Sequence, residues 1–231
     1  IGGDEVSTFA KELSEELDDA FVIPCANGTD ALQIALMSLE IGPGDELIVP
    51  TFTFISPVEV IALLGAKPVL VDVYPDSFNI DCEAVEEAIT DRTKAIVAVH
   101  LFGQCADMGK LMSIADKHNL PIIEDTAQSL TSIYCDEHGL SGKVGTIGTI
   151  GTTSFFPSKN LGCFGDGGAI ITRSEELASE CRTITNHGSK VRYNHSSVGV
   201  NSRLDALQAA ILRVKLRELE YYNKSRRQAA L

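Results

Sequence analysis

Two stretches decide the fold and the chemistry of this 231-residue chain: residues 153–168, TSFFPSKNLGCFGDGG, and residues 123–129, IEDTAQS. Lys159 follows an apolar strand and precedes glycines that let backbone approach a bound group closely. A partly shielded lysine can form a Schiff base with a carbonyl. Asp125 ends an apolar run, where an α/β sheet presents side chains to a ligand. Together they suggest pyridoxal phosphate, because such an acid keeps its ring nitrogen protonated.

The chain on either side alternates between strand and helix patterns. Apolar runs, as expected for strands covered on both faces of a sheet, occupy residues 67–73, 93–101 and 121–125. One helical pattern precedes each of these runs, at residues 57–64, 82–89 and 108–118. This alternation at short spacing predicts an α/β fold with a mainly parallel sheet.

Further elements are predicted at both ends of the chain. Amphipathic helices are expected at residues 4–18, 31–39 and 175–184, and strands at residues 21–24, 46–49 and 167–172. Apolar residues at helical spacing predict one long helix, opened by residues 202–205 and continuing to about residue 230.

Composition limits the class of protein. A chain that is 44% hydrophobic and 22% charged can form one sizeable α/β domain. Its net charge of −13 disfavours nucleic acid or an anionic membrane as a partner. Six cysteines without a C-x-x-C pair favour a reduced, cytoplasmic protein over a disulfide framework. No apolar run approaches the roughly 20 residues that cross a bilayer.

Two other segments have compositions that are found in ligand-binding loops. Residues 145–151, GTIGTIG, match neither the dinucleotide-binding nor the P-loop glycine pattern, which disfavours both sites. Residues 186–193, NHGSKVRY, form a locally basic loop in which Lys190 or Arg192 could bind a pyrophosphate. A flexible, solvated loop is the alternative. His187 and His195 lack spaced partners, so no metal is assigned.

The chain resembles the DegT/DnrJ/EryC1 family of pyridoxal-phosphate-dependent nucleotide-sugar aminotransferases in five ordered blocks. These are NGTDAL (27–32), PTFTF (50–54), EDTAQS (124–129), SFFPSKNLG (154–162) and GVNSRLDALQAA (199–210). The resemblance implies fold type I, a three-layer α/β/α sandwich. Its large cofactor-binding domain would span residues 1–202, and residues 203–231 would lead toward a small C-terminal domain not present in this chain.

The resemblance also implies roles around the cofactor ring. Lys159 would hold C4′, Asp125 the ring nitrogen, and Gln128 the ring oxygen. Phe54 would stack on the ring, whereas Phe52 is expected to pack inward. A structural role for Asp125 as the cap of a following short helix is the alternative.

By the same resemblance, Gly28, Thr29 and Ser154 would hold the cofactor phosphate at the start of a helix, where free N–H groups suit an anion. An ordinary N-cap at residue 27 or 29 is the alternative. Asn201 would reach the phosphate of the neighbouring subunit, which implies a homodimer with shared active sites.

Four residues are candidates for substrate contacts: His187, Lys190, Arg192 and Arg203. For Arg203 a salt bridge with nearby acids is the competing interpretation. The implied reaction moves an amino group, usually from glutamate, to a nucleotide-linked keto sugar in surface polysaccharide or amino-sugar biosynthesis.

The blocks look more like members that aminate 3-keto UDP- or dTDP-sugars than those acting on 4-keto sugars. Lys159 argues against members that dehydrate sugars and have histidine at this position. A non-catalytic regulatory protein that keeps the fold is the remaining alternative.

Overall fold

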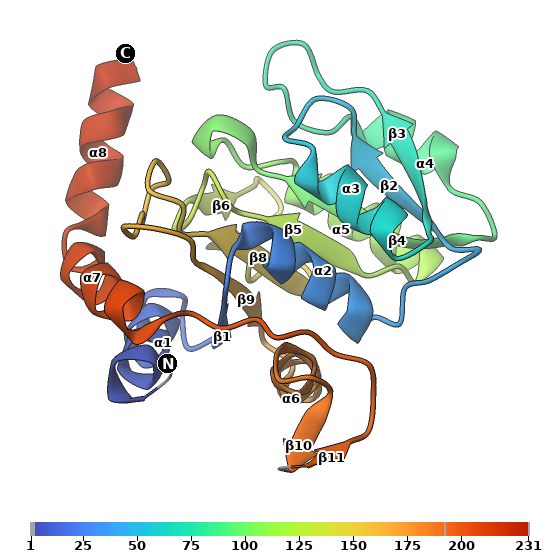
Figure 1. The fold of residues 1–231 in the computed structure, drawn as a ribbon. Helices are drawn as coiled ribbons and strands as arrows, with labels where there is room; N and C mark the ends of the chain where they lie inside the picture. The colour runs from blue at the N-terminus through green and yellow to red at the C-terminus, as the bar shows by residue number, and fades with distance from the viewer. Residues whose placement is uncertain (1–2, 192, 231) are drawn as a thin grey trace.

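The computed structural model describes residues 3–191 and 193–230, and a seven-stranded sheet forms its centre (Figure 1). The strands lie side by side in the order β1-β9-β8-β5-β4-β2-β3. They are β1 (Phe21–Cys25), β2 (Glu46–Pro50), β3 (Lys67–Val71), β4 (Thr93–Val99), β5 (Ile122–Asp125), β8 (Ile150–Ser154) and β9 (Gly168–Thr172). Only β9 pairs antiparallel with its neighbours β8 and β1, so the predicted mainly parallel sheet is confirmed.

Helices cover both faces of the sheet (Figure 1). The helices α2 (Gly28–Ser38), α3 (Ser56–Leu63) and α6 (Glu175–Thr185) share one hydrophobic core with the first face. On the second face, α4 (Cys82–Ala88) and α5 (Met108–His118) pack over one half, and α1 (Asp4–Glu16) and α7 (Ala206–Leu216) over the other. Successive strand residues point to opposite faces, so Ile123 belongs to the first core and Ile122 to the second. The three-layer α/β/α arrangement is therefore confirmed.

Two expected elements differ from the structure at the edges. The run at residues 67–73 was expected to be covered on both faces, but β3 is an edge strand in which Leu70 is 54% exposed. Residues 186–193, expected to be a loop, instead contribute to a hairpin of β10 (Ser189–Val191) and β11 (Asn194–His195). Short local pairing is hard to read from sequence because a strand of two or three residues shows no alternation.

The expected long C-terminal helix is two helices, α7 and α8 (Leu219–Ala230), which meet at an angle (Figure 1). The Glu218 N–H bonds to the Lys215 carbonyl, a tight i→i−3 turn that interrupts the α-helical ladder. Both Leu216 and Leu219 are buried in the core shared with α1. The turn thus lets α7 stay on the core while α8 extends away from it.

Two small elements complete the fold. A hairpin of β6 (Ile133–Cys135) and β7 (Ser141–Lys143) follows β5, and a 3₁₀ turn at Leu101–Gly103 follows β4. All six cysteines are free. In the described part of the chain, no helix is both long and apolar enough to cross a membrane.

Candidate active site

The predicted key residues gather at one edge of the sheet. Strands β5 and β8 are parallel neighbours, so their carboxyl ends lie together (Figure 1). Asp125 is the last residue of β5 and Ser154 the last of β8. The turn carrying Lys159 follows five residues later, close enough for the lysine's charge to affect the pKa of Asp125.

Asp125 is a buried carboxyl group that accepts one hydrogen bond from the described residues. Its Oδ1 accepts a hydrogen bond from the Ala127 N–H at 2.9 Å, and Oδ2 accepts none within the described residues. Burial raises the pKa of Asp125, although the Ala127 N–H and the charge of Lys159 act in the opposite direction. A cation such as a protonated ring nitrogen would compensate this buried charge. Ala127 lies in a turn and no helix follows before residue 133, so the expected role of Asp125 as a helix cap is not found.

A close contact joins the start of α2 to the end of β8. A Cβ added at Gly28 would lie 2.7 Å from the Cβ of Ser154, so only glycine allows this approach. Asn27 caps the helix by accepting a 2.8 Å hydrogen bond from the Asp30 N–H, as the N-cap alternative expected. The N–H groups of Gly28 and Thr29 have no acceptor in the described chain, so they are free to donate to an anion.

Thr29 is tied to a second helix. Its Oγ1 shares a 2.7 Å hydrogen bond with the Oγ of Ser56, at the start of α3. The hydroxyl groups of Thr29 and Ser154 thus flank the free N–H groups of α2. Backbone donors, a helix N-terminus and hydroxyl groups form the usual composition of a phosphate site, so these residues fit the phosphate of the expected cofactor.

The Lys159 turn is anchored on both sides. The Lys159 N–H donates to the Phe156 carbonyl at 2.9 Å, which closes the turn. Phe155 is fully buried and packs edge-on against Phe9 of α1, with ring centroids 5.3 Å apart. A Cβ at Gly162 would lie 2.4 Å from the Pro157 carbonyl oxygen, so the turn requires glycine there. Lys159 itself is half-buried.

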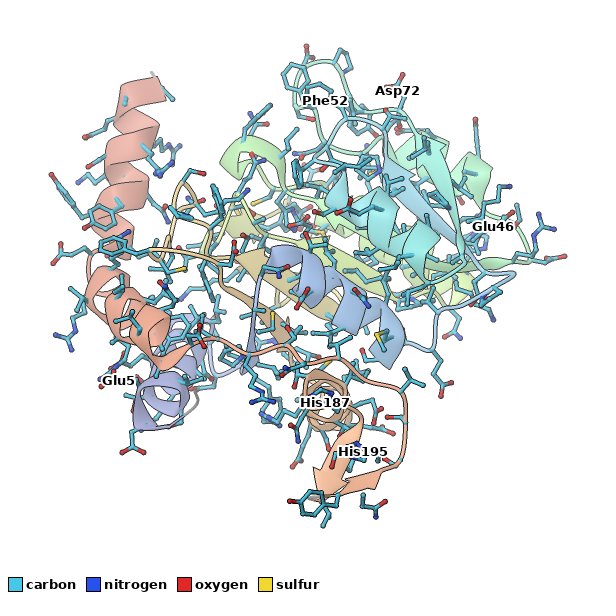
Figure 2. The ribbon with its side chains drawn as sticks, in the orientation of Figure 1. Glu5, Glu46, Phe52, Asp72, His187 and His195 are labelled. Carbon is cyan, nitrogen blue, oxygen red and sulfur yellow. The ribbon has the colours of Figure 1, made fainter. Side chains whose placement is uncertain are left out.

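Gln128 and the predicted aromatic positions lie on neighbouring loops. The Phe102 N–H donates to the Gln128 Oε1 at 2.9 Å, which leaves the Gln128 amide N–H groups for a ligand. Phe54 is 69% exposed and therefore available for stacking. The expectation for Phe52 was wrong, because this residue is 49% exposed and lies at the surface (Figure 2). Its ring packs against those of Phe78 and Phe102. The loop after β2 turns outward, so no core is available to that ring.

Sequence reasoning missed a buried pair directly beneath Asp125. Glu124 and His100 are both fully buried, and the Nε2 of His100 lies 3.0 Å from the Oε2 of Glu124. The Nδ1 of His100 accepts a 3.0 Å hydrogen bond from the Ala106 N–H, so Nε2 carries the hydrogen and donates to Glu124. The His100 N–H also donates to the Asp125 carbonyl.

Glu124 additionally organises the glycine-rich loop. It accepts backbone hydrogen bonds from Gly145, Ile147 and Gly148 at 2.9, 2.9 and 2.6 Å. The sequence carried a signal for this arrangement: an acid inside an apolar strand needs several donors, and a loop of small residues can supply N–H groups.

Among the described residues, no hydrogen bond or ion pair joins the candidate substrate residues His187, Lys190 and Arg203 to the site described above. His187 and Lys190 are exposed near the hairpin under α6; the His187 carbonyl accepts a hydrogen bond from His195 Nδ1, and Lys190 pairs with Glu180 at 3.8 Å (Figure 2). Arg203 is exposed and forms no ion pair among the described residues, so the expected salt bridge is not found. Arg192 lies outside the described residues.

Asn201 is also exposed, and it forms a backbone bridge with Asn186. The next residue, Ser202, is buried and fixes this segment to the start of α2. Its Oγ accepts from the Ala26 N–H at 3.0 Å and donates to Asp30 Oδ2 at 2.5 Å.

Residues 3–191 and 193–230 contain no cluster of three or more His, Cys, Asp or Glu side chains able to hold a metal ion.

Comparisons with known proteins show which proteins this chain resembles. A Pseudomonas aeruginosa protein, UDP-2-acetamido-2-deoxy-3-oxo-D-glucuronate aminotransferase, is 52% identical over 220 residues, 95% of this chain and 60% of the relative. The pleiotropic regulatory protein of Geobacillus stearothermophilus is 49% identical over 231 residues, 100% of this chain and 60% of the relative. The chain therefore spans less than two thirds of the length of these curated relatives.

A solved structure shares the fold. NtdA from Bacillus subtilis with bound cofactor PMP matches with a TM-score of 0.85 and 37% identity, covering 96% of this chain and 49% of that one. This match confirms the expected fold type I architecture. Residues 1–231 match the profile named DegT/DnrJ/EryC1/StrS aminotransferase family, and the chain belongs to that family.

Proposed function

We propose that this chain carries the cofactor-binding part of a pyridoxal-phosphate-dependent aminotransferase that acts on a nucleotide-linked 3-keto sugar. This proposal is supported mainly by three features at one edge of the sheet: the half-buried Lys159, the buried Asp125 with one hydrogen-bond donor, and the donor site of Gly28, Thr29 and Ser154. These match the aldehyde, ring nitrogen and phosphate of pyridoxal phosphate. The PMP bound to NtdA supports this choice of cofactor.

Each residue then has a defined task. The bound cofactor supplies an electron sink that stabilises a carbanion at the substrate carbon. Asp125 holds the proton on the ring nitrogen, and Gly28, Thr29 and Ser154 bind the phosphate. Lys159 would hold the cofactor at C4′, and its free amine would move a proton between the donor's α-carbon and C4′.

The outer part of the site is assigned by the same proposal. Gln128 donates its amide to the ring oxygen, and Phe54 covers the ring face. Asn201 completes the phosphate site of a second subunit in a homodimer, and Lys190, Arg192, His187 and Arg203 contact the nucleotide sugar. The exposure of His187, Lys190, Asn201 and Arg203 in the single chain supports a role between subunits. We also propose that the cofactor-binding domain ends at residue 202 and that residues 203–231 lead toward a C-terminal domain.

The substrate class follows from the relatives. The name of the Pseudomonas aeruginosa relative specifies a UDP-linked 3-oxo sugar acid, which favours a 3-keto over a 4-keto substrate. We propose glutamate as the amino donor, a cytoplasmic location and a role in surface polysaccharide or amino-sugar biosynthesis. The acidic chain supports a protein without nucleic-acid or membrane partners.

A regulatory role is the second candidate, because one relative with 49% identity is named a pleiotropic regulatory protein. Absorbance of the purified full-length protein distinguishes the two. We expect a visible cofactor band that disappears on adding glutamate, and no such band in Lys159→Ala. If the wild type takes up no cofactor when it is supplied, the aminotransferase proposal fails. If glutamate removes the band, UDP- and dTDP-linked 3-keto and 4-keto sugars are added in turn to find which acceptor restores it.

A further inference from the structure

Helix α8 lies against the turn that carries Lys159. Apart from Leu219 at its start, α8 contributes no buried residue, so its position is not explained by a hydrophobic core. Its contacts are instead polar. Two side chains on one face, Asn223 and Arg226, reach the segments on either side of the candidate site.

Asn223 joins the two catalytic segments directly. Its Nδ2 donates to the Leu130 carbonyl at 3.3 Å and to the Thr131 Oγ1 at 3.1 Å, just after the segment that carries Asp125 and Gln128. Its Oδ1 accepts from the Asn160 Nδ2 at 2.7 Å, next to Lys159. A carbonyl oxygen accepts only, so the bond to Leu130 fixes the orientation of the amide.

The bond to Thr131 supports an unusual backbone conformation. Thr131 has a φ of 66°, the left-handed region, which is unfavourable for a β-branched residue. Such conformations persist where surrounding contacts hold them in place, and Asn223 supplies two such contacts. Removing its amide therefore loosens the segment after β5 as well as the Lys159 turn.

Arg226 binds the Lys159 turn itself. Its Nη2 donates to the Ser158 carbonyl at 3.1 Å and reaches the Lys159 carbonyl at 3.5 Å. From α7, Gln208 accepts a 2.8 Å hydrogen bond from the Phe164 N–H, and Lys215 donates to the Gly162 carbonyl. The two C-terminal helices thus bind backbone groups along the turn, and α8 binds those nearest the lysine.

We propose that Asn223 and Arg226 are positioning residues that fix the Lys159 amine relative to Asp125. They act through the backbone of residues 158–160 and 130–131, not by touching the substrate. The catalytic part of this inference rests on the proposed function, since it assumes that Lys159 is the reacting amine. The geometric part, which concerns the position of Lys159 alone, does not.

The test compares Asn223→Ala and Arg226→Ala with Arg227→Ala in the full-length protein. Arg227 is the matched control: it is the neighbouring arginine, is exposed, and has no hydrogen bond or ion pair among the described residues. In cofactor-free protein, acylation of Lys159 by an amine-specific reagent is followed by peptide mass spectrometry. We expect acylation at least about threefold faster in both test variants, because local opening exposes the amine.

With cofactor bound, two further measurements report the position of the amine. The pH titration of the visible cofactor band should shift in both test variants. The single-turnover rate with glutamate should fall roughly tenfold to a hundredfold, the loss expected from misplacing a reacting group by about 1 Å. Arg226→Lys, which keeps a donor for the same carbonyls, should recover part of the rate.

The outcomes separate the two proposals. The positioning role would be overturned if, in both test variants, the acylation and single-turnover rates stayed within about twofold of wild type and the pH titration of the band did not shift. That result would leave the aminotransferase proposal intact. A wild type that takes up no cofactor overturns the proposed function, and the acylation rates then decide the positioning role alone. Arg226 is exposed, so its replacement by alanine tests the idea without disturbing a core.

Discussion

Gly28, at the start of α2, lies against Ser154, the last residue of β8, so closely that a Cβ at residue 28 would be 2.7 Å from the serine Cβ. This approach brings the free N–H groups of a helix N-terminus beside a hydroxyl group from the adjacent sheet edge. A phosphate bound there would contact both. The contact therefore links one glycine to cofactor affinity.

We expect Gly28→Ala to weaken cofactor binding about tenfold or more, because overpacking typically costs about 1–3 kcal/mol and here moves α2 away from Ser154. Cofactor titration followed by absorbance measures the affinity, and thermal unfolding of the cofactor-free protein measures the general destabilisation. Gly42→Ala is the control, since nothing lies within 4 Å of its Cβ position. Wild-type affinity in Gly28→Ala would rule out this site as the phosphate site.

Asp125→Asn should stabilise the cofactor-free protein while abolishing tight cofactor binding. Burial raises the pKa of Asp125, so between its unfolded and folded pKa values the folded state binds more protons. Stability of the wild type therefore falls as pH rises through that window, and asparagine, which does not ionise, avoids the loss.

The measurement is urea unfolding of both cofactor-free proteins at neutral pH and again below pH 4. The stability advantage of Asp125→Asn should be larger at neutral pH. If Asp125→Asn is no more stable than the wild type at either pH, burial of the Asp125 carboxylate does not destabilise the folded protein.

The sequence was sufficient to predict the mainly parallel sheet and the position of Asp125 at the end of a strand. Near-continuous apolar runs are typical of strands that are buried on both faces of a parallel sheet. The carboxyl ends of neighbouring parallel strands then meet at one edge of that sheet. Asn27 was also readable as a cap, because capping is local.

What the sequence did not show depends on contacts between distant segments. Asn223 bonds to residues 63 and 93 positions away, and nothing in the local pattern of α8 distinguishes it from a solvated amide. The break between α7 and α8 likewise follows from where Leu216 and Leu219 find a core. Phe52 was misplaced because its partners, Phe78 and Phe102, come from two other loops.

Cysteine reactivity should separate one thiol from the rest. Cys135 is exposed, whereas burial raises the pKa of Cys82 to about 12 and that of Cys105 to about 11. Because the thiolate is the reactive form, we expect a maleimide to label Cys135 rapidly in the native protein.

The half-buried Cys105 should react more slowly than Cys135, and the four buried cysteines should react only when the protein unfolds; these are Cys25, Cys82, Cys163 and Cys181. Peptide mass spectrometry after brief labelling, with and without denaturant, measures this. Rapid native labelling of the fully buried Cys25 would contradict the packing between α2, α6 and the sheet.

Glu124→Gln should destabilise the protein by about 3 kcal/mol, since a buried donor left unsatisfied costs about 1–3 kcal/mol. The glutamine amide would replace one acceptor oxygen by a donor. In either orientation that NH₂ group faces two donors: Gly145 N–H and His100 Nε2–H, or the N–H groups of Ile147 and Gly148.

Urea unfolding measures the loss, with Glu87→Gln, an exposed acid on α4, as the control. The cofactor band provides the second measurement. Because Glu124 precedes Asp125 and fixes the loop leading into β8, we expect Glu124→Gln to weaken cofactor binding in protein that is still folded. A variant with wild-type stability would mean that the four hydrogen bonds to Glu124 can be replaced by water, and the acid beneath Asp125 would then have no structural role.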